Sequence, residues 1–298
     1  MRRYLDKLRD RRRATGAATA AAIAPADVAD ASAAAGRGRA PVDDQYVTTA
    51  PSDQNALDIF KGEWSSQLPG PFAELEAGSA RLFEDDRITW AAAAFGGVAG
   101  KRVLELGPLE AGHTAMLEQL GAESIVAVEA NTRAYLKCLI VKEILELRRA
   151  RFLCGDFVAY LRTTDARFDL CVASGVLYHM ENPVELIALL SRVCDRVFIW
   201  THYYDEAIFT NNAAIAGKIT AHTAAEHQGF RHTLHQYNYR DARAWAAFCG
   251  GSGQISHWMT RADILGCLGH YGFTDIRINF DHPHHPNGPS FAVVAMRG

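Results

Sequence analysis

The sequence predicts an α/β protein built on one mostly parallel sheet of seven strands, with helices on both faces and an antiparallel hairpin at the end. From residue 102 onward, short apolar runs typical of buried strands alternate with longer amphipathic stretches typical of helices. This alternation indicates a parallel sheet with right-handed crossovers. The last two apolar runs are joined by only nine residues, DHPHHPNGP, which are too few for a helical crossover, so these strands are expected to pair antiparallel.

The individual elements follow in chain order. Residues 51–100 are expected to be mainly helical, with helices in 56–64 and 71–95 separated by Pro-Gly-Pro. Strands are predicted at 102–106, 124–130, 150–156, 168–174, 195–203, 274–280 and 290–297. Helices are predicted at 113–121, 131–149, 157–164, 182–194 and 260–273, the last with Thr260 as its N-cap and Gly272 as its stop.

The chain has 298 residues and is 49% hydrophobic, which is enough to bury a sizeable core. Residues 1–50 differ from the rest, since Ala, Gly, Pro and small polar residues dominate there and cannot offset the entropy of ordering. We therefore expect a disordered basic, Ala-rich tail over 1–50 and a globular domain over 51–298. Within that domain, 205–257 interrupts the alternation and is interpreted as an insertion that determines substrate specificity.

Charge and cysteine content restrict the function. The first thirteen residues carry seven Lys/Arg against two Asp, so the net charge of −3 leaves the remaining chain near −8. An acidic body argues against a nucleic-acid-binding core. The six cysteines form no C-x-x-C pair, which is typical of reduced thiols in a cytoplasmic protein. No secretory signal is apparent, and no apolar run approaches the roughly 18 residues that would span a membrane.

The segment GPLEAGHT, residues 107–114, follows the first strand of the sheet, where ligands of such folds bind. Three interpretations compete. A triphosphate-binding loop requires a lysine where His113 stands, and a dinucleotide-binding loop requires a glycine where Leu109 stands. The third interpretation depends on the acidic residues nearby.

Three carboxylates lie at the ends of successive strands. Glu105 precedes the loop and can face a cation, while Glu129 ends the second strand and suits a pair of ribose hydroxyls. Asp156 ends the third strand, where it can accept a hydrogen bond from an adenine amino group, with Phe157 beside the ring. A ligand with an adenosine, a positive centre and no phosphate fits this set, and S-adenosylmethionine is such a ligand.

Several motifs resemble those of the class I S-adenosylmethionine-dependent methyltransferases, over about residues 55–298. ELGPLEAGHT is similar to the family's first motif, VAVEAN to the end of its second strand, CGDF to its adenine-contacting turn, and FDLCVASGVLYHMENP to its fourth-strand motif. Leu109 and Ala111 stand where the family usually has glycine. The resemblance implies a Rossmann-like sheet and cofactor contacts by Glu105, Gly107, Pro108, Gly112, Glu129, Ala130, Asn131, Gly155, Asp156, Phe157, Ser174 and Gly175.

The methyl acceptor is expected beside the cofactor, where an oxygen or nitrogen acceptor also has a proton to lose. Two histidines are the candidate bases: His179 follows the fourth strand and His202 closes the fifth. Aromatic faces with a few polar groups suit a small organic ligand. The candidate substrate-binding residues are Tyr178, Tyr203, Tyr204, Tyr239, His257 and Trp258.

Eleven of the twelve histidines fall at or after residue 179, which raises the question of a metal site. Histidines five residues apart, as in His222 and His227, do not share one helical face, and no metal is predicted.

The predicted function is transfer of a methyl group from S-adenosylmethionine to an oxygen or nitrogen of a small molecule. Two alternatives stay open. The GVLYH element also occurs in a transfer-RNA wobble-uridine methyl- or carboxymethyltransferase branch, and a non-catalytic cofactor-binding protein would retain the same fold. The sequence does not predict the oligomeric state.

Overall fold

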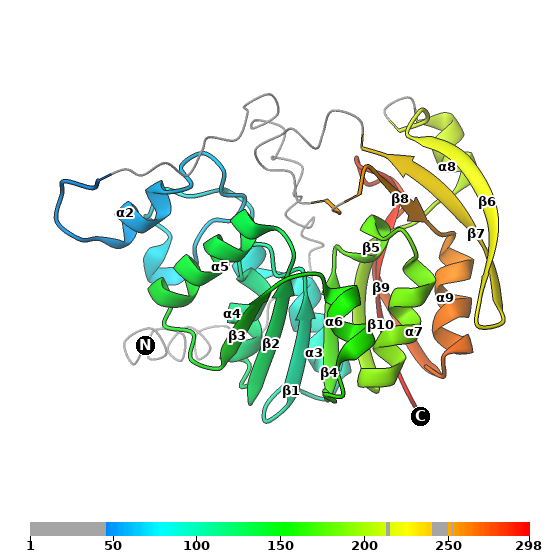
Figure 1. The fold of residues 1–298 in the computed structure, drawn as a ribbon, viewed down its shortest axis with the longest axis horizontal. Coiled ribbons are helices and arrows are strands. Elements are labelled where there is room, and N and C mark those ends of the chain that lie inside the picture. The colour runs from blue at the N-terminus through cyan, green and yellow to red at the C-terminus, as the bar shows by residue number, and fades with distance from the viewer. Residues whose placement is uncertain (1–45, 213–214, 240–249, 252) are drawn as a thin grey trace, which may run out of the picture.

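The computed structural model describes residues 46–212, 215–239, 250–251 and 253–298 (Figure 1). Its centre is a seven-stranded sheet in the order β3-β2-β1-β4-β5-β10-β9. The strands are β1 (Arg102–Leu106), β2 (Ser124–Glu129), β3 (Ala150–Cys154), β4 (Leu170–Ser174), β5 (Arg196–His202), β9 (Asp275–His282) and β10 (Ser290–Met296). The predicted fold class is therefore confirmed. The predicted tail lies almost wholly outside the described residues.

The first five strands run parallel, and the order in which the chain adds strands reverses at β1. This strand pairs with β2 on one side and with β4 on the other. The last two strands form the predicted antiparallel hairpin, in which β10 inserts between β5 and β9. The gap between the loops that follow β1 and β4 is the switch point at which sheets of this kind bind ligands.

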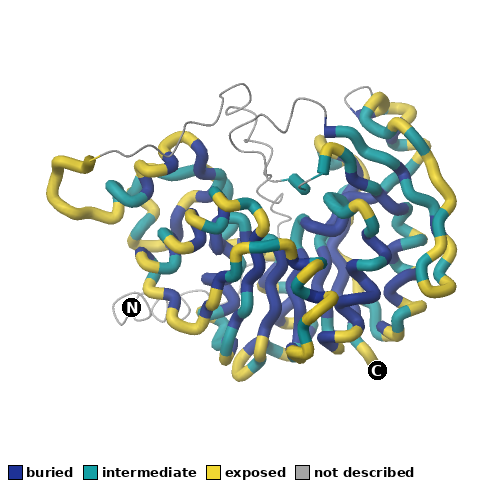
Figure 2. The backbone as a smooth tube through the Cα atoms, viewed as in Figure 1, coloured by how far each residue is buried: buried dark blue, intermediate teal, exposed yellow. Residues whose placement is uncertain are grey.

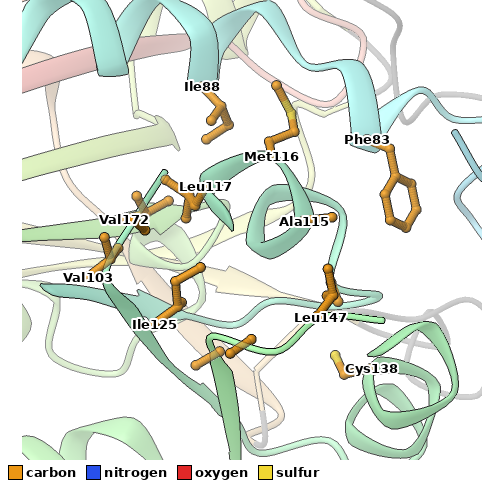
Figure 3. Close-up of a cluster of buried hydrophobic side chains, with 14 of the residues drawn as sticks. Phe83, Ile88, Val103, Ala115, Met116, Leu117, Ile125, Cys138, Leu147 and Val172 are labelled. Carbon is orange, nitrogen blue, oxygen red and sulfur yellow. The ribbon is translucent and has the colours of Figure 1, made fainter. Parts of the chain in front are cut away.

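One face of the sheet is covered by α3 (Asp86–Ala94), α4 (Gly112–Gln119) and α5 (Thr132–Ile144). Val103, Ile125 and Val172 from the strands pack there with Met116, Leu117 and other buried residues of this first core cluster (Figure 3). The helices begin at side-chain caps, since Asp85 accepts from the Arg87 N–H and Asn131 accepts from the Arg133 and Ala134 N–H groups.

The other face is covered by α6 (Phe157–Thr163), α7 (Pro183–Val193) and α9 (Arg261–His270). Alternate strand residues, including Leu104, Cys171 and Ile199, turn toward these helices and form the second core cluster. Buried strands between two helical layers appear as the continuous dark-blue centre of Figure 2. Of the described helices, none is long and apolar enough to cross a membrane.

The segment before the sheet is less helical than predicted. Of the helix predicted over 56–64, only the part that overlaps α2 (Asp53–Asp58) is helical. Of the helix predicted over 71–95, only the parts in η2 (Gly70–Phe72), η3 (Leu82–Glu84) and α3 are helical. The intervening backbone forms hydrogen bonds with an earlier segment, since the Ala80 N–H donates to the Ser65 carbonyl and the Gln67 N–H to the Ala80 carbonyl. A Cβ at Gly78 would lie 2.2 Å from the Ser65 carbonyl carbon, so this close approach requires glycine.

The insertion forms its own layer, which was not predicted. After α8 (Glu206–Asn211), β6 (Ile219–His227), β7 (Phe230–Asn238) and β8 (Ile255–Trp258) make a three-stranded antiparallel sheet at the upper right of Figure 1. The β6–β7 turn has positive φ at Gln228 (49°) and Gly229 (84°), as a two-residue hairpin turn requires. The turn is fixed to α9, because the Tyr271 hydroxyl donates to the His227 carbonyl at 3.1 Å.

Candidate active site

The loop after β1 has an unusual backbone. Gly107, Leu109 and Ala111 have φ values of 64°, 55° and 61°, all in the left-handed region. This conformation costs a non-glycine residue roughly 1–2 kcal/mol. The two non-glycine residues are those at which the family resemblance leads one to expect glycine. The loop thus adopts a glycine-like path without two of the glycines, and other contacts must hold it there.

Glu129, at the end of β2, binds the loop directly. Its carboxylate accepts from the Leu109 N–H at 3.2 Å and from the Asn131 N–H at 2.8 Å. Burial raises the pKa of Glu129 despite these two hydrogen bonds. A carboxylate has about four lone-pair sites, so Glu129 can also accept from a ligand.

Glu105 lies beneath the loop and is only 1% exposed. Its carboxylate accepts from the Thr114 hydroxyl at 2.5 Å, and burial raises its pKa. Among the described residues, no lysine or arginine forms an ion pair with Glu105 or Glu129. Two buried carboxylates beside one loop repel phosphate and favour a ligand that brings positive charge.

His113 stands at the position of a phosphate-binding lysine, but its side chain forms a contact outside the loop. Its Nε2 lies 2.8 Å from a carboxylate oxygen of Asp85, which also accepts from Arg87. Burial alone would raise the pKa of Asp85, but the hydrogen bonds from His113 and Arg87 hold it well below its usual range. The side chain of His113 is therefore tied to α3, which argues against a triphosphate loop.

Asp156 was predicted to end the third strand, but β3 ends two residues earlier, at Cys154, and both Asp156 and Phe157 have structural roles in α6 and the core. Asp156 is exposed and caps α6, since its Oδ1 accepts from the Ala159 N–H at 2.7 Å. Phe157 is 8% exposed and packs in the second core cluster. Contacts of these two residues with adenine stay a prediction.

The remaining predicted cofactor residues divide into two groups. Gly112 is buried, and a Cβ there would lie 2.7 Å from the Leu82 carbonyl oxygen, so its lack of a side chain serves packing onto η3. The others lie at or just after the carboxyl ends of β1–β4: Pro108, Ala130, Asn131, Gly155, Ser174 and Gly175. Their contacts with a cofactor stay predictions.

The two candidate bases lie in one aromatic cluster, which consists of Tyr178, His179, Trp200, His202, Tyr239, Trp258 and His285. His202 stacks on Trp258 with ring centroids 5.2 Å apart and planes 10° apart. The Tyr178 ring lies 4.0 Å from that of His179 and 4.7 Å from that of His202. His179 shares a 2.5 Å hydrogen bond between its Nδ1 and the Tyr239 hydroxyl. The fold thus brings residues from five separated segments together.

Both histidines are neutral at physiological pH. Burial lowers the pKa of His179 to about 3. Burial, with a smaller effect of His285, lowers that of His202 to about 3 as well. The Nδ1 of His202 lies 2.8 Å from the Gly288 carbonyl oxygen, which only accepts, so Nδ1 carries the proton and Nε2 keeps its lone pair.

Three other predicted substrate residues lie around this cluster. Tyr204 packs with Phe209 in a third apolar cluster that includes Trp258. His257 donates from Nδ1 to the Glu181 carbonyl at 2.7 Å. Tyr203 turns into the second core cluster against Phe291 and is not part of the aromatic cluster. Trp200 and His285 were missed, although a tryptophan near the end of an apolar strand was an available signal.

The histidines of the insertion lie on strands, so a helical-face argument does not apply to them. His222 and His235 face each other across the β6–β7 pair, with their Nδ1 atoms 2.6 Å apart. Burial, then the proximity of His222, lowers the pKa of His235 to about 4. Within the described residues, no group of three or more His, Cys, Asp or Glu is placed to hold a metal ion.

Comparison with known proteins identifies the enzyme class. Residues 104–196, from β1 into β5, match the family model described as a methyltransferase domain. This segment contains the left-handed loop, Glu105, Glu129 and His179. Together with the fold, this match supports a class I S-adenosylmethionine-dependent methyltransferase. No curated protein matches it.

Solved structures of low identity share the fold of this methyltransferase. The N-terminal domain of EvdMO1, crystallised with S-adenosylhomocysteine, aligns with a TM-score of 0.61 and 20% identity, covering 85% of this chain and 100% of that one. The same domain in the presence of S-adenosylhomocysteine and D-fucose gives 0.60 and 21%, with coverage of 82% and 95%. An S-adenosylmethionine-dependent methyltransferase from Mesorhizobium loti gives 0.50 and 16%, with coverage of 72% and 100%.

Proposed function

We propose that this methyltransferase binds S-adenosylmethionine over the loop of residues 107–111, with Glu129 accepting from the ribose hydroxyls and Asp156 from the adenine amino group. Glu105 faces the positively charged end of the cofactor. The observation that carries the proposal is the pair of buried carboxylates beside the left-handed loop, with no basic ion-pair partner among the described residues. A cationic adenosine ligand supplies the charge that they lack.

We further propose that the acceptor is an uncharged, ring-containing small molecule bound against the aromatic cluster. The two histidines of the cluster are neutral, and aromatic faces stack well on flat or sugar-like rings. The insertion, residues 205–257, supplies Tyr239 to the cluster, and Trp258 follows it directly at the end of β8, so we assign the insertion the role of determining specificity. Since D-fucose was present in one EvdMO1 structure, hydroxylated rings are the first acceptors to test.

We assign His202 as the base. Its Nε2 lone pair accepts the hydrogen bond of the acceptor O–H or N–H and orients that atom. S-adenosylmethionine, when bound, would supply the methyl group to the acceptor's electron pair and would leave as neutral S-adenosylhomocysteine with the electrons of the broken carbon–sulfur bond. The Nε2 of His202 would take up the acceptor's proton. Because imidazolium formation in a buried site is unfavourable, positioning supplies much of the acceleration.

The test is transfer of a labelled methyl group from S-adenosylmethionine to a panel of sugars, phenols, aromatic amines and bulk transfer RNA. We expect labelled product with an uncharged ring compound, and a large loss of turnover in His202→Gln with S-adenosylhomocysteine binding retained. Labelled RNA, with binding that falls steeply as salt rises, would instead establish the transfer-RNA alternative. Cofactor binding with no transfer to any acceptor would favour a non-catalytic binder.

We also propose a cytoplasmic location, which reduced thiols support. The five cysteines that the structure describes are free, and four of them are buried.

A further inference from the structure

The loop of residues 107–111 rests on a buried group of charges that the proposed chemistry does not use. Glu110 lies between the two left-handed non-glycine residues, and its side chain is 1% exposed. A carboxylate this deeply buried is costly unless every contact is satisfied. The sequence gives no reason to expect it, since the corresponding position of a glycine-rich loop needs no charge.

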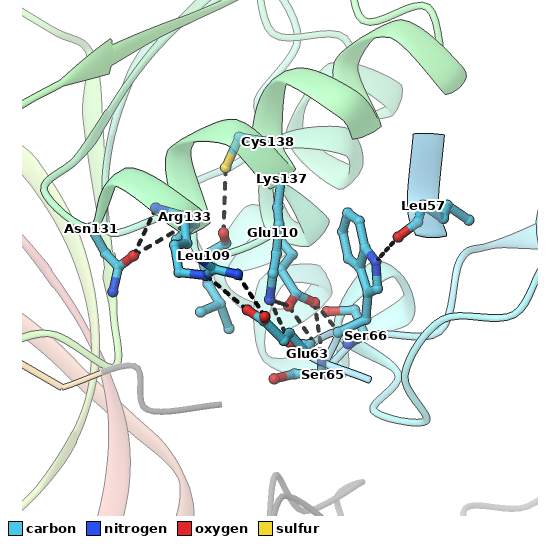
Figure 4. Close-up of polar contacts among 12 residues, drawn as sticks. Leu57, Glu63, Ser65, Ser66, Leu109, Glu110, Asn131, Arg133, Lys137 and Cys138 are labelled. Carbon is cyan, nitrogen blue, oxygen red and sulfur yellow. Dashed lines mark hydrogen bonds and ion pairs between the residues drawn. The ribbon is translucent and has the colours of Figure 1, made fainter. Parts of the chain in front are cut away.

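The Glu110 carboxylate makes its contacts with residues outside the loop (Figure 4). Its carboxylate accepts from the Ser65 N–H at 3.0 Å and from the Ser66 N–H at 2.8 Å. It also forms an ion pair with Lys137 on α5, with Nζ 2.9 Å from Oε1. Lys137 donates in turn to the Glu63 carbonyl, and the Glu63 carboxylate accepts from Arg133 at 2.6 and 2.9 Å. Two segments distant in sequence thus converge on one loop residue.

These contacts fix the backbone around Glu110. If Leu109 or Ala111 relaxed to negative φ, the peptide units on either side of Glu110 would rotate and withdraw its carboxylate. Three charge-assisted hydrogen bonds would break, and Lys137, which is 6% exposed, would lose its counter-ion in a buried site. Holding the carboxylate therefore offsets the strain of two left-handed residues.

The loop geometry also orients Glu129. The Leu109 N–H that donates to Glu129 at 3.2 Å points there only while the loop keeps its left-handed path. We infer that Glu110, clamped by Lys137 and the Ser65–Ser66 backbone, is a positioning residue for the cofactor: it replaces the conformational freedom that glycine would give the loop. This inference rests on the proposed placement of S-adenosylmethionine over the loop.

The test compares the dissociation constant for S-adenosylhomocysteine, by isothermal titration calorimetry, with the melting temperature of the ligand-free protein. Glu110→Gln keeps the volume and loses the ion pair. We expect its affinity to fall about tenfold, or about 1.4 kcal/mol. Lys137→Met leaves the bonds from Ser65 and Ser66 in place, and we expect a smaller loss of about threefold. It also serves as the test if Glu110→Gln does not fold.

Rescue by glycine separates positioning from mere stability. Because glycine populates positive φ as readily as negative, Glu110→Gln/Ala111→Gly is expected to recover most of the lost affinity. The single variant Ala111→Gly completes the double-mutant cycle. Val293→Ala, in the core of β10 away from the loop, controls for general destabilisation: its melting temperature falls while its affinity stays within twofold of wild type.

Two results would overturn the inference. One is Glu110→Gln and Lys137→Met binding S-adenosylhomocysteine as wild type does while melting earlier. The other is a loss of affinity that Ala111→Gly does not reverse. A wild-type protein that binds no S-adenosylhomocysteine would refute the proposed cofactor site instead, so the two failures are distinguishable.

Discussion

Two histidines with lowered pKa values predict a specific loss of stability in acid. His179 and His202 have folded pKa values of about 3, against 6.5 for a free histidine. Between these values the unfolded chain binds a proton at each histidine and the folded chain does not. Stability therefore decreases as pH falls below 6.5, by about 1.4 kcal/mol per pH unit for each group. From pH 7 to pH 5 each histidine lowers the free energy of unfolding by about 2 kcal/mol.

The assay is urea unfolding of wild type, His179→Gln, His202→Gln and the double variant at pH 7, 6 and 5. Comparison between variants removes the contributions of the carboxylates, whose titration is common to all of them. We expect each single variant to lose about 2 kcal/mol less than wild type between pH 7 and 5. The double variant should lose about 4 kcal/mol less.

His284→Gln, which makes the same exchange at an exposed side chain, supplies the matched control. If His202→Gln and wild type lost stability in parallel, His202 would titrate alike in both states. Its burial against Trp258 and Tyr178 would then not govern its protonation, and the reasoning from burial would be refuted.

Three further predictions concern the site. Glu129→Gln should weaken S-adenosylhomocysteine binding by roughly 1.5–3 kcal/mol in calorimetry, because hydrogen bonds to a charged acceptor are lost. Glu118→Gln is the matched control, since the Glu118 carboxylate also accepts two backbone N–H bonds, at 2.8 and 3.0 Å, and this variant should bind as wild type does. Gly107→Ala should lose both stability and affinity for S-adenosylhomocysteine, since the added Cβ would lie 2.8 Å from a Val176 side-chain atom at a residue with φ 64°. Gly96→Ala, at a residue with φ 76° and open space around it, should lose stability alone. With a methyl acceptor in hand, kcat should stay level from pH 8 down to about pH 5, because His202 stays neutral there; an acid limb with an apparent pKa near 6.5 would contradict this assignment.

Elements with strong local signals were predictable from the sequence. The span of β1 matches its prediction, and those of β2, β4 and β5 differ only at their ends, because buried parallel strands are continuous apolar runs with clear flanks. Glu105 and Glu129 lie at the ends of β1 and β2 as predicted for the same reason, whereas Asp156 lies two residues beyond β3. The predicted N-cap, Thr260, accepts from the Asp263 N–H at 3.0 Å.

Elements that depend on long-range contacts were not predictable. The 71–81 segment has helix-forming residues, but its backbone bonds to residues 65–67 instead. α5 ends five residues early, where Glu146 has φ 53°. The β6–β7 hairpin is rich in alanine and histidine and lies mostly half-exposed, so neither its composition nor its hydrophobic pattern indicated strands. Its Gln-Gly turn was the one local signal available.

The charge cluster beneath the cofactor loop illustrates the same limit. Lys137 and Glu110 are twenty-seven residues apart, and each resembles an ordinary surface charge in the sequence. Only the packing of α5 and the 63–66 segment against the loop buries them together. The departures at Leu109 and Ala111 were visible in the sequence, whereas the contacts that compensate for them required the structure.

The most direct test of the central claim is a thermal-shift panel with S-adenosylhomocysteine, S-adenosylmethionine, NAD and ATP with magnesium. A ligand at a hundred times its dissociation constant stabilises the folded state by about 2.7 kcal/mol, which raises the melting temperature by several degrees. We predict that S-adenosylhomocysteine and S-adenosylmethionine raise it and that NAD and ATP do not. A shift with ATP or NAD and none with S-adenosylhomocysteine would contradict the assignment of Glu105, Glu129 and the left-handed loop to an S-adenosylmethionine site.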